Sequence, residues 1–290
     1  MEWGMQNRIA RMFPGTSGNT VMVAVDHGYF MGPTHHLEDP RATIAPLLPY
    51  ADAIALTRGV LRACVPPTAT TPIVLRVSGG VTVLKEDLSD ESIVTTMEDA
   101  VRINASALCH SVFVGAPHEH ASLANLARLV DAGQETGIPV MAITAVGKEL
   151  EKRDARYLSL ACRVSAEIGA HLVKTYYCDG FSKVVDGCPV PIVVAGGPRL
   201  DSDREALELC HSAIEQGAHG IDMGRNIWQS EHPVAMLKGL RAIIHEKATV
   251  NEALDVLAAE VKAGGAATAG SATAPPALRP AIHRPRAPAH

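Results

Sequence analysis

The chain has 290 residues, a length that suits one large domain or two small ones. Hydrophobic residues make up 47% of it, enough for a sizeable core, and the formal net charge of −5 gives no basic footprint for nucleic acid. No stretch approaches the roughly 18 apolar residues of a membrane span, and residues 1–8 lack the apolar core of a secretory signal.

The six cysteines are scattered, without the close spacing of a zinc site or a disulfide framework. We therefore expect buried thiols in a cytoplasmic protein and no bound metal. Two histidine clusters fit this expectation: His35-His36 lies in a polar segment typical of a solvated loop, and His118-Glu119-His120 is interpreted as the start of a helix.

Short apolar runs recur along the chain after a lead-in that ends near residue 18. They cover 21–25, 53–56, 73–75, 108–114, 139–143, 172–174, 191–194 and 220–223. Each run is too short for a typical helix and several are rich in β-branched residues, which is the pattern of a parallel strand buried on both faces. The sequence thus predicts eight strands.

Amphipathic segments of helix length separate these strands. They cover 41–49, 90–104, 119–136, 150–168 and 203–216, with 232–246 and 250–263 after the last strand. The acidic residues of 89–92 and 201–203 predict helix N-termini at those points. Because strands alternate with helices, we expect a parallel sheet. Eight units favour a closed (β/α)₈ barrel over a doubly wound sheet, since no G-x-G-x-x-G follows the first strand.

The predicted organisation is a lead-in over 1–20, a single barrel over 21–262 and a tail over 263–290. The tail is rich in Ala, Pro and Gly, without periodicity, so we expect it to be disordered and solvated.

Glycine-rich turns follow the seventh and eighth strands, where barrel enzymes commonly bind phosphate. Gly196 and Gly197 follow the seventh strand, and Gly224 and Arg225 follow the eighth. Glycines let backbone N–H groups approach an anion, and an arginine adds a charged fork. These residues could merely turn tight loops, but their shared position favours a phosphate site. Ser78-Gly79, after the third strand, are further substrate-binding candidates.

Lys174 ends the sixth strand and faces the same end of the barrel. On its own it could be a surface lysine whose head reaches water. In an apolar setting, however, a lysine can lose its proton near neutral pH and attack a carbonyl to form a Schiff base. Asp26, after the first strand, is a candidate for proton transfer, although it could instead cap a turn. Lys148, after the fifth strand, is a weaker candidate because it could simply begin the next helix.

Four motifs together resemble the archaeal-type class I aldolase family. They are Asp26-His27-Gly28, Val173-Lys174-Thr175, Ala195-Gly196-Gly197-Pro198 and 224–229. The similarity runs from about Trp3 to Leu257. It implies a Schiff-base (β/α)₈ barrel acting on a phosphorylated substrate, with Lys174 holding the substrate carbonyl.

One departure separates two branches of this family. The aldolases carry a tyrosine after the fifth strand as proton donor and acceptor, whereas Ala145 stands here and cannot move a proton. The chain is in this respect similar to the thiolase members, which act in autoinducer-2 processing. That resemblance implies coenzyme A as co-substrate, with products dihydroxyacetone phosphate and acetyl-CoA, and self-association, commonly as a decamer. Alternatives are an aldolase or aldol synthase acting on a sugar such as fructose 1,6-bisphosphate, and a non-catalytic sugar-phosphate sensor.

Overall fold

Eight parallel strands close into a barrel in the computed structural model, which describes residues 1–15, 17–145 and 153–267. The strands are β1 (Thr20–Ala24), β2 (Ala53–Thr57), β3 (Ile73–Arg76), β6 (Ala107–Val112), β7 (Val140–Thr144), β8 (Leu172–Tyr176), β9 (Ile192–Ala195) and β10 (Gly220–Met223). Around the barrel they follow the order β1-β10-β9-β8-β7-β6-β3-β2, and β1 pairs with both β10 and β2. The predicted (β/α)₈ barrel and its eight strands are confirmed.

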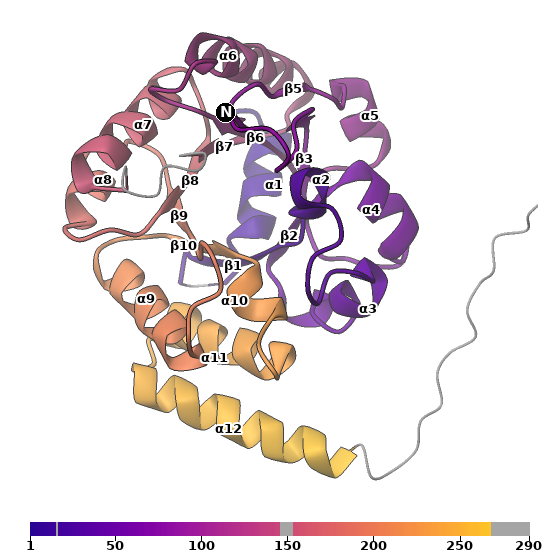
Figure 1. Cartoon of the computed structure of the whole chain (residues 1–290), viewed down its shortest axis with the longest axis vertical. Coiled ribbons are helices and arrows are strands. Elements are labelled where there is room, and N and C mark those ends of the chain that lie inside the picture. The colour runs from indigo at the N-terminus through magenta and orange to yellow at the C-terminus, as the bar shows by residue number, and fades with distance from the viewer. Residues whose placement is uncertain (16, 146–152, 268–290) are drawn as a thin grey trace, which may run out of the picture.

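Most of the helices surround the barrel on the outside (Figure 1). The helices of the described residues are α1 (Trp3–Met12), α2 (Gly28–Met31), α3 (Pro40–Ile44), η1 (Leu48–Tyr50), α4 (Arg58–Cys64), α5 (Met97–Arg102), α6 (Glu119–Thr136), α7 (Ala155–Glu167), α8 (Ser182–Asp186), α9 (Asp203–Glu215), α10 (Arg225–Trp228), α11 (Pro233–Glu246) and α12 (Val250–Ala267). Helix α12 continues past residue 263, where the sequence suggested the tail begins; residues 268–290 lie outside the described part. None of the described helices is both long and apolar enough to cross a membrane.

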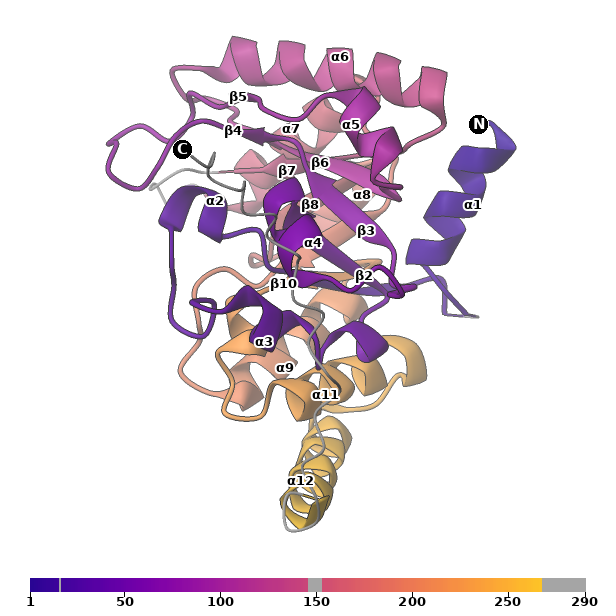
Figure 2. The ribbon, with the colours of Figure 1, turned by 90° about the vertical axis from the view of Figure 1, so that its right-hand side faces the viewer.

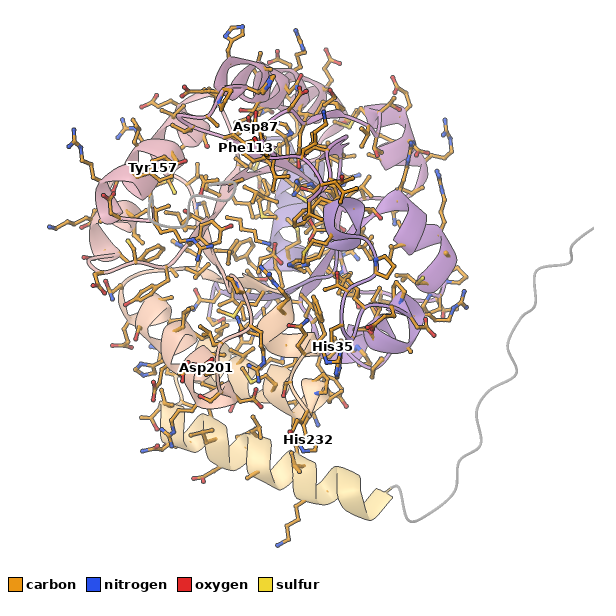
Figure 3. The ribbon with its side chains drawn as sticks, viewed as in Figure 1. His35, Asp87, Phe113, Tyr157, Asp201 and His232 are labelled. Carbon is orange, nitrogen blue, oxygen red and sulfur yellow. The ribbon has the colours of Figure 1, made fainter. Side chains whose placement is uncertain are left out.

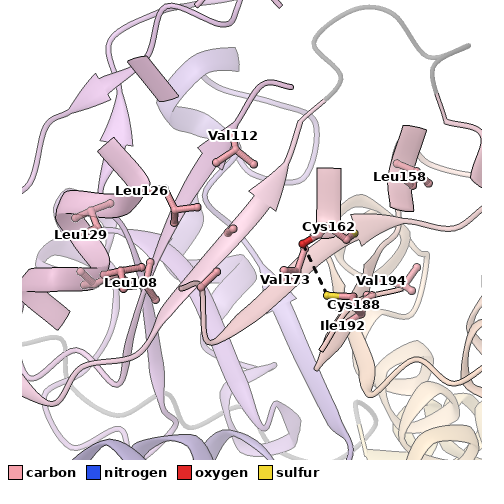
Figure 4. Close-up of a cluster of buried hydrophobic side chains, with 14 of the residues drawn as sticks. Leu108, Val112, Leu126, Leu129, Leu158, Cys162, Val173, Cys188, Ile192 and Val194 are labelled. Carbon is pink, nitrogen blue, oxygen red and sulfur yellow. Dashed lines mark hydrogen bonds between the residues drawn. The ribbon is translucent and has the colours of Figure 1, made fainter. Parts of the chain in front are cut away.

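The core has an inner and an outer layer, as expected for strands that are buried on both faces. Small and unbranched side chains such as Met22, Ala55 and Met141 fill the barrel interior. Larger aliphatic side chains lie between the strands and the helices, and Figure 4 shows part of this layer, with Leu108 of β6 near Leu126 and Leu129 of α6.

Helix α1 closes the end of the barrel from which the strands start. Figure 2 shows it on the opposite side of the barrel from α2, β4 and β5. Met12 is fully buried and packs with the interior side chains, and Ile9 and Phe13 pack against the same cluster. The other end of the barrel, where the strands finish, carries the βα loops.

The prediction of a helix over 90–104 is wrong in its first part. Residues after β3 form a short antiparallel hairpin, β4 (Ser78–Gly79) with β5 (Ser92–Ile93), and α5 begins only at Met97, where the Thr96 hydroxyl accepts a hydrogen bond from the Asp99 N–H. Glu91, taken as part of an exposed first turn, is instead buried among polar side chains. The hairpin brings Glu91 to the end of the barrel where the strands finish.

One further predicted helix differs from the elements observed, and another agrees with its helix. Residues 41–49 form two short elements, α3 and η1, with Pro46 between them, since proline cannot continue a helix hydrogen-bond ladder. The predicted helix over 203–216 agrees with α9, where the Ser202 hydroxyl accepts from the Glu205 N–H.

Candidate active site

A cavity of about 160 Å³ lies at the end of the barrel where the strands finish. Its walls include six of the residues predicted from the sequence: Lys174, Asp26, Gly196, Gly197, Gly224 and Arg225. They come from β8 and from the turns after β1, β9 and β10, so the closure of the barrel brings together residues that are distant in sequence.

Lys174 projects from β8 into this cavity and forms an ion pair with Asp222 of β10. Its Nζ donates to Asp222 Oδ2 at 2.8 Å, and both residues are buried. Asp222 was not among the predicted site residues, although a carboxylate within an apolar strand carries the same signal that drew attention to Lys174. The other oxygen, Asp222 Oδ1, has no hydrogen-bond partner among the described residues.

The expectation that Lys174 sits in an apolar setting with a lowered pKa is wrong. Burial alone would lower the pKa of this ammonium group, but the charges of Asp222 and Asp26 outweigh burial and raise it. Burial raises the pKa of Asp222, against the opposing charge of Lys174. The pair is therefore an ammonium and a carboxylate at neutral pH, with a carboxylate that accepts a proton more readily than an exposed one does.

Asp26 lies directly after β1 and stays ionised. Burial would raise its pKa, but the charges of Arg76 and Lys174 lower it overall. The next residue, His27, is held edge-on to the ring of Trp228 at 5.5 Å between centroids. Burial lowers the pKa of His27 to about 4, so this ring is neutral at pH 7. Asp26 thus supplies a second carboxylate to the Lys174 side of the cavity.

Arg76, the last residue of β3, is buried at the centre of a polar network that the sequence did not reveal. Its guanidinium donates to Glu91 at 3.1 Å and to Ser111 Oγ at 2.5 Å, and lies 3.5 Å from Asp26 Oδ2. It also donates to the Tyr29 hydroxyl, which in turn donates to Glu91 at 2.5 Å. Burial disfavours the charge on Arg76, but Tyr29, Glu91 and Asp26 raise its pKa, so it remains a cation.

The turns after β9 and β10 lie close together and require glycine. A Cβ at Gly224 would come within 2.5 Å of both the Ala24 carbonyl oxygen and the His27 ring, and Gly197 has a φ of +68°. The buried Asn226 side chain ties the turns together: its amide donates to the Gly196 carbonyl at 2.9 Å and accepts from the Leu200 N–H at 2.8 Å. Because α10 has only four residues, backbone groups and Arg225, rather than a helix dipole, carry any anion binding here.

Arg153 adds a second cation to this corner of the site. Its guanidinium carbon lies 3.7 Å from the centroid of the Tyr176 ring. A Cβ at Gly197 would lie 3.4 Å from Arg153 Nη1. Neither Arg153 nor Arg225 has an ion-pair partner among the described residues, and burial together with the charge of Arg153 lowers the pKa of Arg225. Two guanidinium groups beside glycine turns, without an ion-pair partner in the described part of the chain, are suited to a phosphate dianion.

Three other predicted residues lie apart from the cavity walls or outside the described part. Ser78 and Gly79 are buried in β4 behind Arg76: the Ser78 hydroxyl donates to Glu91 at 2.6 Å, and Gly79 packs against the Tyr29 ring. Lys148 lies outside the described residues. Within the described residues, no group of three or more His, Cys, Asp and Glu side chains could hold a metal.

The two histidine clusters lie in the elements that the sequence indicated. Helix α6 begins at Glu119, and His118 forms ion pairs with Asp87 at 3.6 Å and Asp90 at 3.5 Å. His35, labelled in Figure 3, is exposed in the segment between α2 and α3.

Comparison with known proteins identifies the family of this chain. The sequence profile of the DeoC/LacD family aldolases matches residues 20–230, which is most of the barrel. The chain belongs to this aldolase family. Its members are enzymes, and the cavity described above contains a buried lysine, Lys174, with the carboxylates of Asp26 and Asp222.

Relatives within the family include two thiolases. The chain is 52% identical over 261 residues to the 3-hydroxy-5-phosphonooxypentane-2,4-dione thiolase of Escherichia coli, covering 90% of this chain and 89% of the relative. The thiolase of the same name from Salmonella typhimurium is also 52% identical, with the same coverage.

Solved structures of more distant proteins have the same barrel. An archaeal fructose 1,6-bisphosphate aldolase aligns with a TM-score of 0.75 at 24% identity, covering 83% of this chain and 99% of that one. The fructose-bisphosphate aldolase of Slackia heliotrinireducens aligns with a TM-score of 0.79 at 19% identity, covering 89% and 90%. At this identity the likeness extends to the fold.

Proposed function

We propose that this aldolase-family protein is a thiolase that cleaves 3-hydroxy-5-phosphonooxypentane-2,4-dione with coenzyme A, giving dihydroxyacetone phosphate and acetyl-CoA. The observation that carries the proposal is that one cavity is lined by Lys174, by the Asp222 carboxylate that pairs with it, and by the glycine turns with Arg225. The relatives that are 52% identical are named as thiolases of this dione. Ala145 lines the cavity where a tyrosine proton donor is expected in the aldolases, which favours thiolysis over aldol cleavage.

The phosphate of the substrate would bind to backbone groups at Gly196, Gly197 and Gly224 and to the guanidinium of Arg225. Anchored in this way, carbon 4, next to the phosphate-bearing carbon, would be presented to Lys174. The lysine transfers its proton to Asp222, and the neutral amine attacks carbon 4 to give a carbinolamine. Asp222 then returns the proton to the carbinolamine hydroxyl, which leaves as water and gives an iminium ion. This iminium then accepts the electron pair released when the bond between carbons 2 and 3 breaks.

Asp26 is proposed to take the proton of the coenzyme A thiol and to return it to carbon 3 after cleavage. Against the effect of burial, the charges of Arg76 and Lys174 lower the pKa of Asp26 and keep it ionised at neutral pH, the state in which a carboxylate can act as a base. Lys148, which lies outside the described residues, is retained as a second proton-transfer candidate. Ser78 and Gly79 would support the substrate through Glu91 and Tyr29 rather than by direct contact.

The proposal extends to the setting of the reaction. Coenzyme A would be a co-substrate and not a resident cofactor. All six cysteines are free, which supports a reducing compartment, and we propose the cytoplasm. We also propose self-association, with a decamer as the expected size, to be measured by light scattering after size-exclusion chromatography.

The first experiment is borohydride trapping of the wild type and of Lys174→Ala with dihydroxyacetone phosphate, followed by peptide mapping. A reduced adduct on the Lys174 peptide of the wild type, absent from Lys174→Ala and retained in the exposed-lysine control Lys183→Ala, is expected. Acetyl-CoA formation from the dione should fall by at least about 10³-fold in Lys174→Ala, because the electron sink is lost.

Three results would contradict the proposal. Ligand binding without any adduct would exclude the imine. Cleavage of fructose 1,6-bisphosphate without coenzyme A would point to an aldolase instead. Tight binding of the phosphorylated dione without turnover would point to a sensor.

A further inference from the structure

Two cavity residues, Arg76 and Ser111, have no part in the proposed steps at Lys174. Arg76 ends β3 and Ser111 belongs to β6, and both line the cavity. In the strand order of the barrel, β3 lies opposite β9 and β6 lies opposite β10. These two residues therefore face the phosphate turns from across the barrel, with Lys174 on the wall between them.

If the phosphate of the substrate binds at the turns after β9 and β10 and its carbonyl carbon binds Lys174, the end of the substrate without phosphate extends toward Arg76 and Ser111. In the dione named for the relatives, the phosphate is on carbon 5, the proposed iminium forms at carbon 4, and the acetyl carbonyl is at carbon 2. Extended across the barrel, the chain directs the carbon 2 oxygen toward β3 and β6. The apolar side chains at this end, including Phe30, Val81, Leu88 and Phe113 (labelled in Figure 3), suit the terminal methyl group.

The hydrogen bonds of Arg76 and Ser111 leave donors available there. Ser111 Oγ accepts from Arg76 Nη2 at 2.5 Å, and its hydroxyl hydrogen has no acceptor among the described residues. On the other side of the guanidinium, the Nη1 group makes one hydrogen bond to the described residues, a long one of 3.5 Å to Asp26. Glu91 and Tyr29 hold the guanidinium in place. Preorganised donors in a buried site are the arrangement that stabilises a developing oxyanion.

We propose that Arg76 and Ser111 form the oxyanion site for the acetyl carbonyl during thiolysis, an assignment that rests on the proposed function. The thiolate sulfur bonds to carbon 2, and the carbonyl electron pair moves to oxygen, where Ser111 O–H and Arg76 Nη1–H donate to it. Collapse re-forms the carbonyl of acetyl-CoA and breaks the bond between carbons 2 and 3. The released pair moves into the Lys174 iminium as an enamine, carbon 3 takes the thiol proton, and water releases dihydroxyacetone phosphate.

This assignment also accounts for Ala145. An aldol cleavage needs a base for a substrate hydroxyl, whereas thiolysis needs a donor for a carbonyl oxygen that becomes negative. Arg76 and Ser111 are donors held in fixed positions at β3 and β6, which suits the second task. The site would thus differ from an aldolase site in two ways: it stabilises an oxyanion on the acetyl carbonyl, and it has Ala145 in place of the tyrosine.

The test compares two reactions in the wild type, Ser111→Ala and Arg76→Lys, with Ser165→Ala as a control for a buried serine that bonds within α7. One reaction is acetyl-CoA formation from the phosphorylated dione. The other is exchange of a carbon-bound proton of dihydroxyacetone phosphate with D₂O, which needs the Lys174 enamine and no acetyl carbonyl. We expect Ser111→Ala to lose about 10²-fold in kcat for thiolysis while exchange stays within about threefold of the wild type.

Each other outcome overturns the assignment. Undiminished thiolysis in Ser111→Ala excludes it as an oxyanion donor, and an equal loss of exchange and thiolysis shows a structural role instead. Arg76→Lys keeps a positive charge beside Glu91, so a folded variant with normal thiolysis would exclude the guanidinium in the same way. A wild type that exchanges protons but makes no acetyl-CoA would remove the thiolase proposal itself, and the oxyanion site with it.

Discussion

Lys174 Nζ and Asp222 Oδ2 lie 2.8 Å apart inside the barrel. This contact stabilises the buried ammonium group and also keeps the amine protonated. A buried ammonium without a partner would be costly, and Asp222 removes that cost. The same carboxylate raises the pKa of Lys174, so the amine becomes nucleophilic only when its proton moves. Asp222 should therefore contribute to the reaction and not only to the fold.

Replacing Asp222 with asparagine separates its effect on the pKa of Lys174 from its role as proton acceptor. Asp222→Asn removes the largest charge that raises the pKa of Lys174, so that pKa should fall and the pH dependence of borohydride trapping should move to lower pH. Turnover should nevertheless drop by about 10²-fold, because no group at that position can accept the lysine proton. The measurement is the trapping rate from pH 5 to pH 9, together with kcat. An unmoved pH profile, or the same changes in the exposed control Asp201→Asn, would show that Asp222 does not act on Lys174.

The sequence revealed some site residues and concealed others for a physical reason. Lys174, Asp26 and the glycine turns were predictable because barrel enzymes place their chemistry where strands end. Asp222 and Arg76 carried a comparable signal, a charge within or at the end of an apolar strand, but nothing in the sequence named their partners. The partner of each charge depends on the closure of the barrel, which brings residues of separate strands together: Asp222 with Lys174, and Arg76 with Asp26.

At the scale of elements, the hairpin β4–β5 is the feature that the sequence misrepresented. The acidic residues 89–92 predicted a helix start, because carboxylates are common there. In the structure Glu91 pairs with the buried cation of Arg76, and a buried charge pair decides the local conformation more strongly than a helix propensity does. The eight strands, by contrast, were predictable from their apolar runs, since burial on both faces leaves a continuous signal.

The turns after β9 and β10 act as one element because Asn226 holds them together. Asn226→Ala would remove its hydrogen bonds to Gly196, Pro198 and Leu200 and leave buried backbone groups unpaired. We expect the KM of the phosphorylated dione to rise about tenfold, and the free energy of unfolding to fall by about 1–3 kcal/mol.

The comparison that isolates the phosphate site is trapping with dihydroxyacetone phosphate against trapping with dihydroxyacetone. The loss in Asn226→Ala should be confined to the phosphorylated ligand, because only that ligand uses the two turns. Asn251→Ala is the matched control, since Asn251 bonds to Arg204 at the surface. An equal loss for both ligands would mean that Asn226 supports the barrel and not the phosphate site.

For the whole molecule, the two ends of the barrel are built for different purposes. The end where strands finish gathers Lys174, Arg76 and Asp26, whose burial costs stability unless every charge is paired. The opposite end is closed by α1. Asp52, directly before β2, lies at that end and is not among the residues that line the cavity. In barrel enzymes the end where the strands start contributes to stability. That stability offsets the cost of burying charged residues at the end where the strands finish.

Asp52 provides the test of this division. Its carboxylate accepts from the Val21 N–H at 2.8 Å, from Arg241 at 2.6 Å and from His245 at 2.7 Å, so it ties the barrel to α11. Burial would raise the pKa of Asp52, but the hydrogen bonds of His245 and Arg241 lower it below the model-compound value of 3.8. A carboxyl group whose pKa is lower in the folded than in the unfolded state stabilises the fold above the unfolded pKa, and that contribution is lost as the pH falls through the folded pKa.

Asp52→Asn should therefore destabilise the protein by about 2–3 kcal/mol at pH 7, and the difference from the wild type should shrink only below about pH 4. The measurement is the free energy of urea unfolding from pH 7 down to pH 3 at one protein concentration, with Asp255→Asn, an exposed acid of α12, as control. Proton exchange into dihydroxyacetone phosphate by the folded variant at pH 7 should match the wild type, because Asp52 does not line the cavity. A loss of stability that is constant from pH 7 to pH 3 would show that the ionised carboxylate is not what ties the barrel to α11. A loss of exchange in the folded variant would show that the two ends of the barrel are not independent.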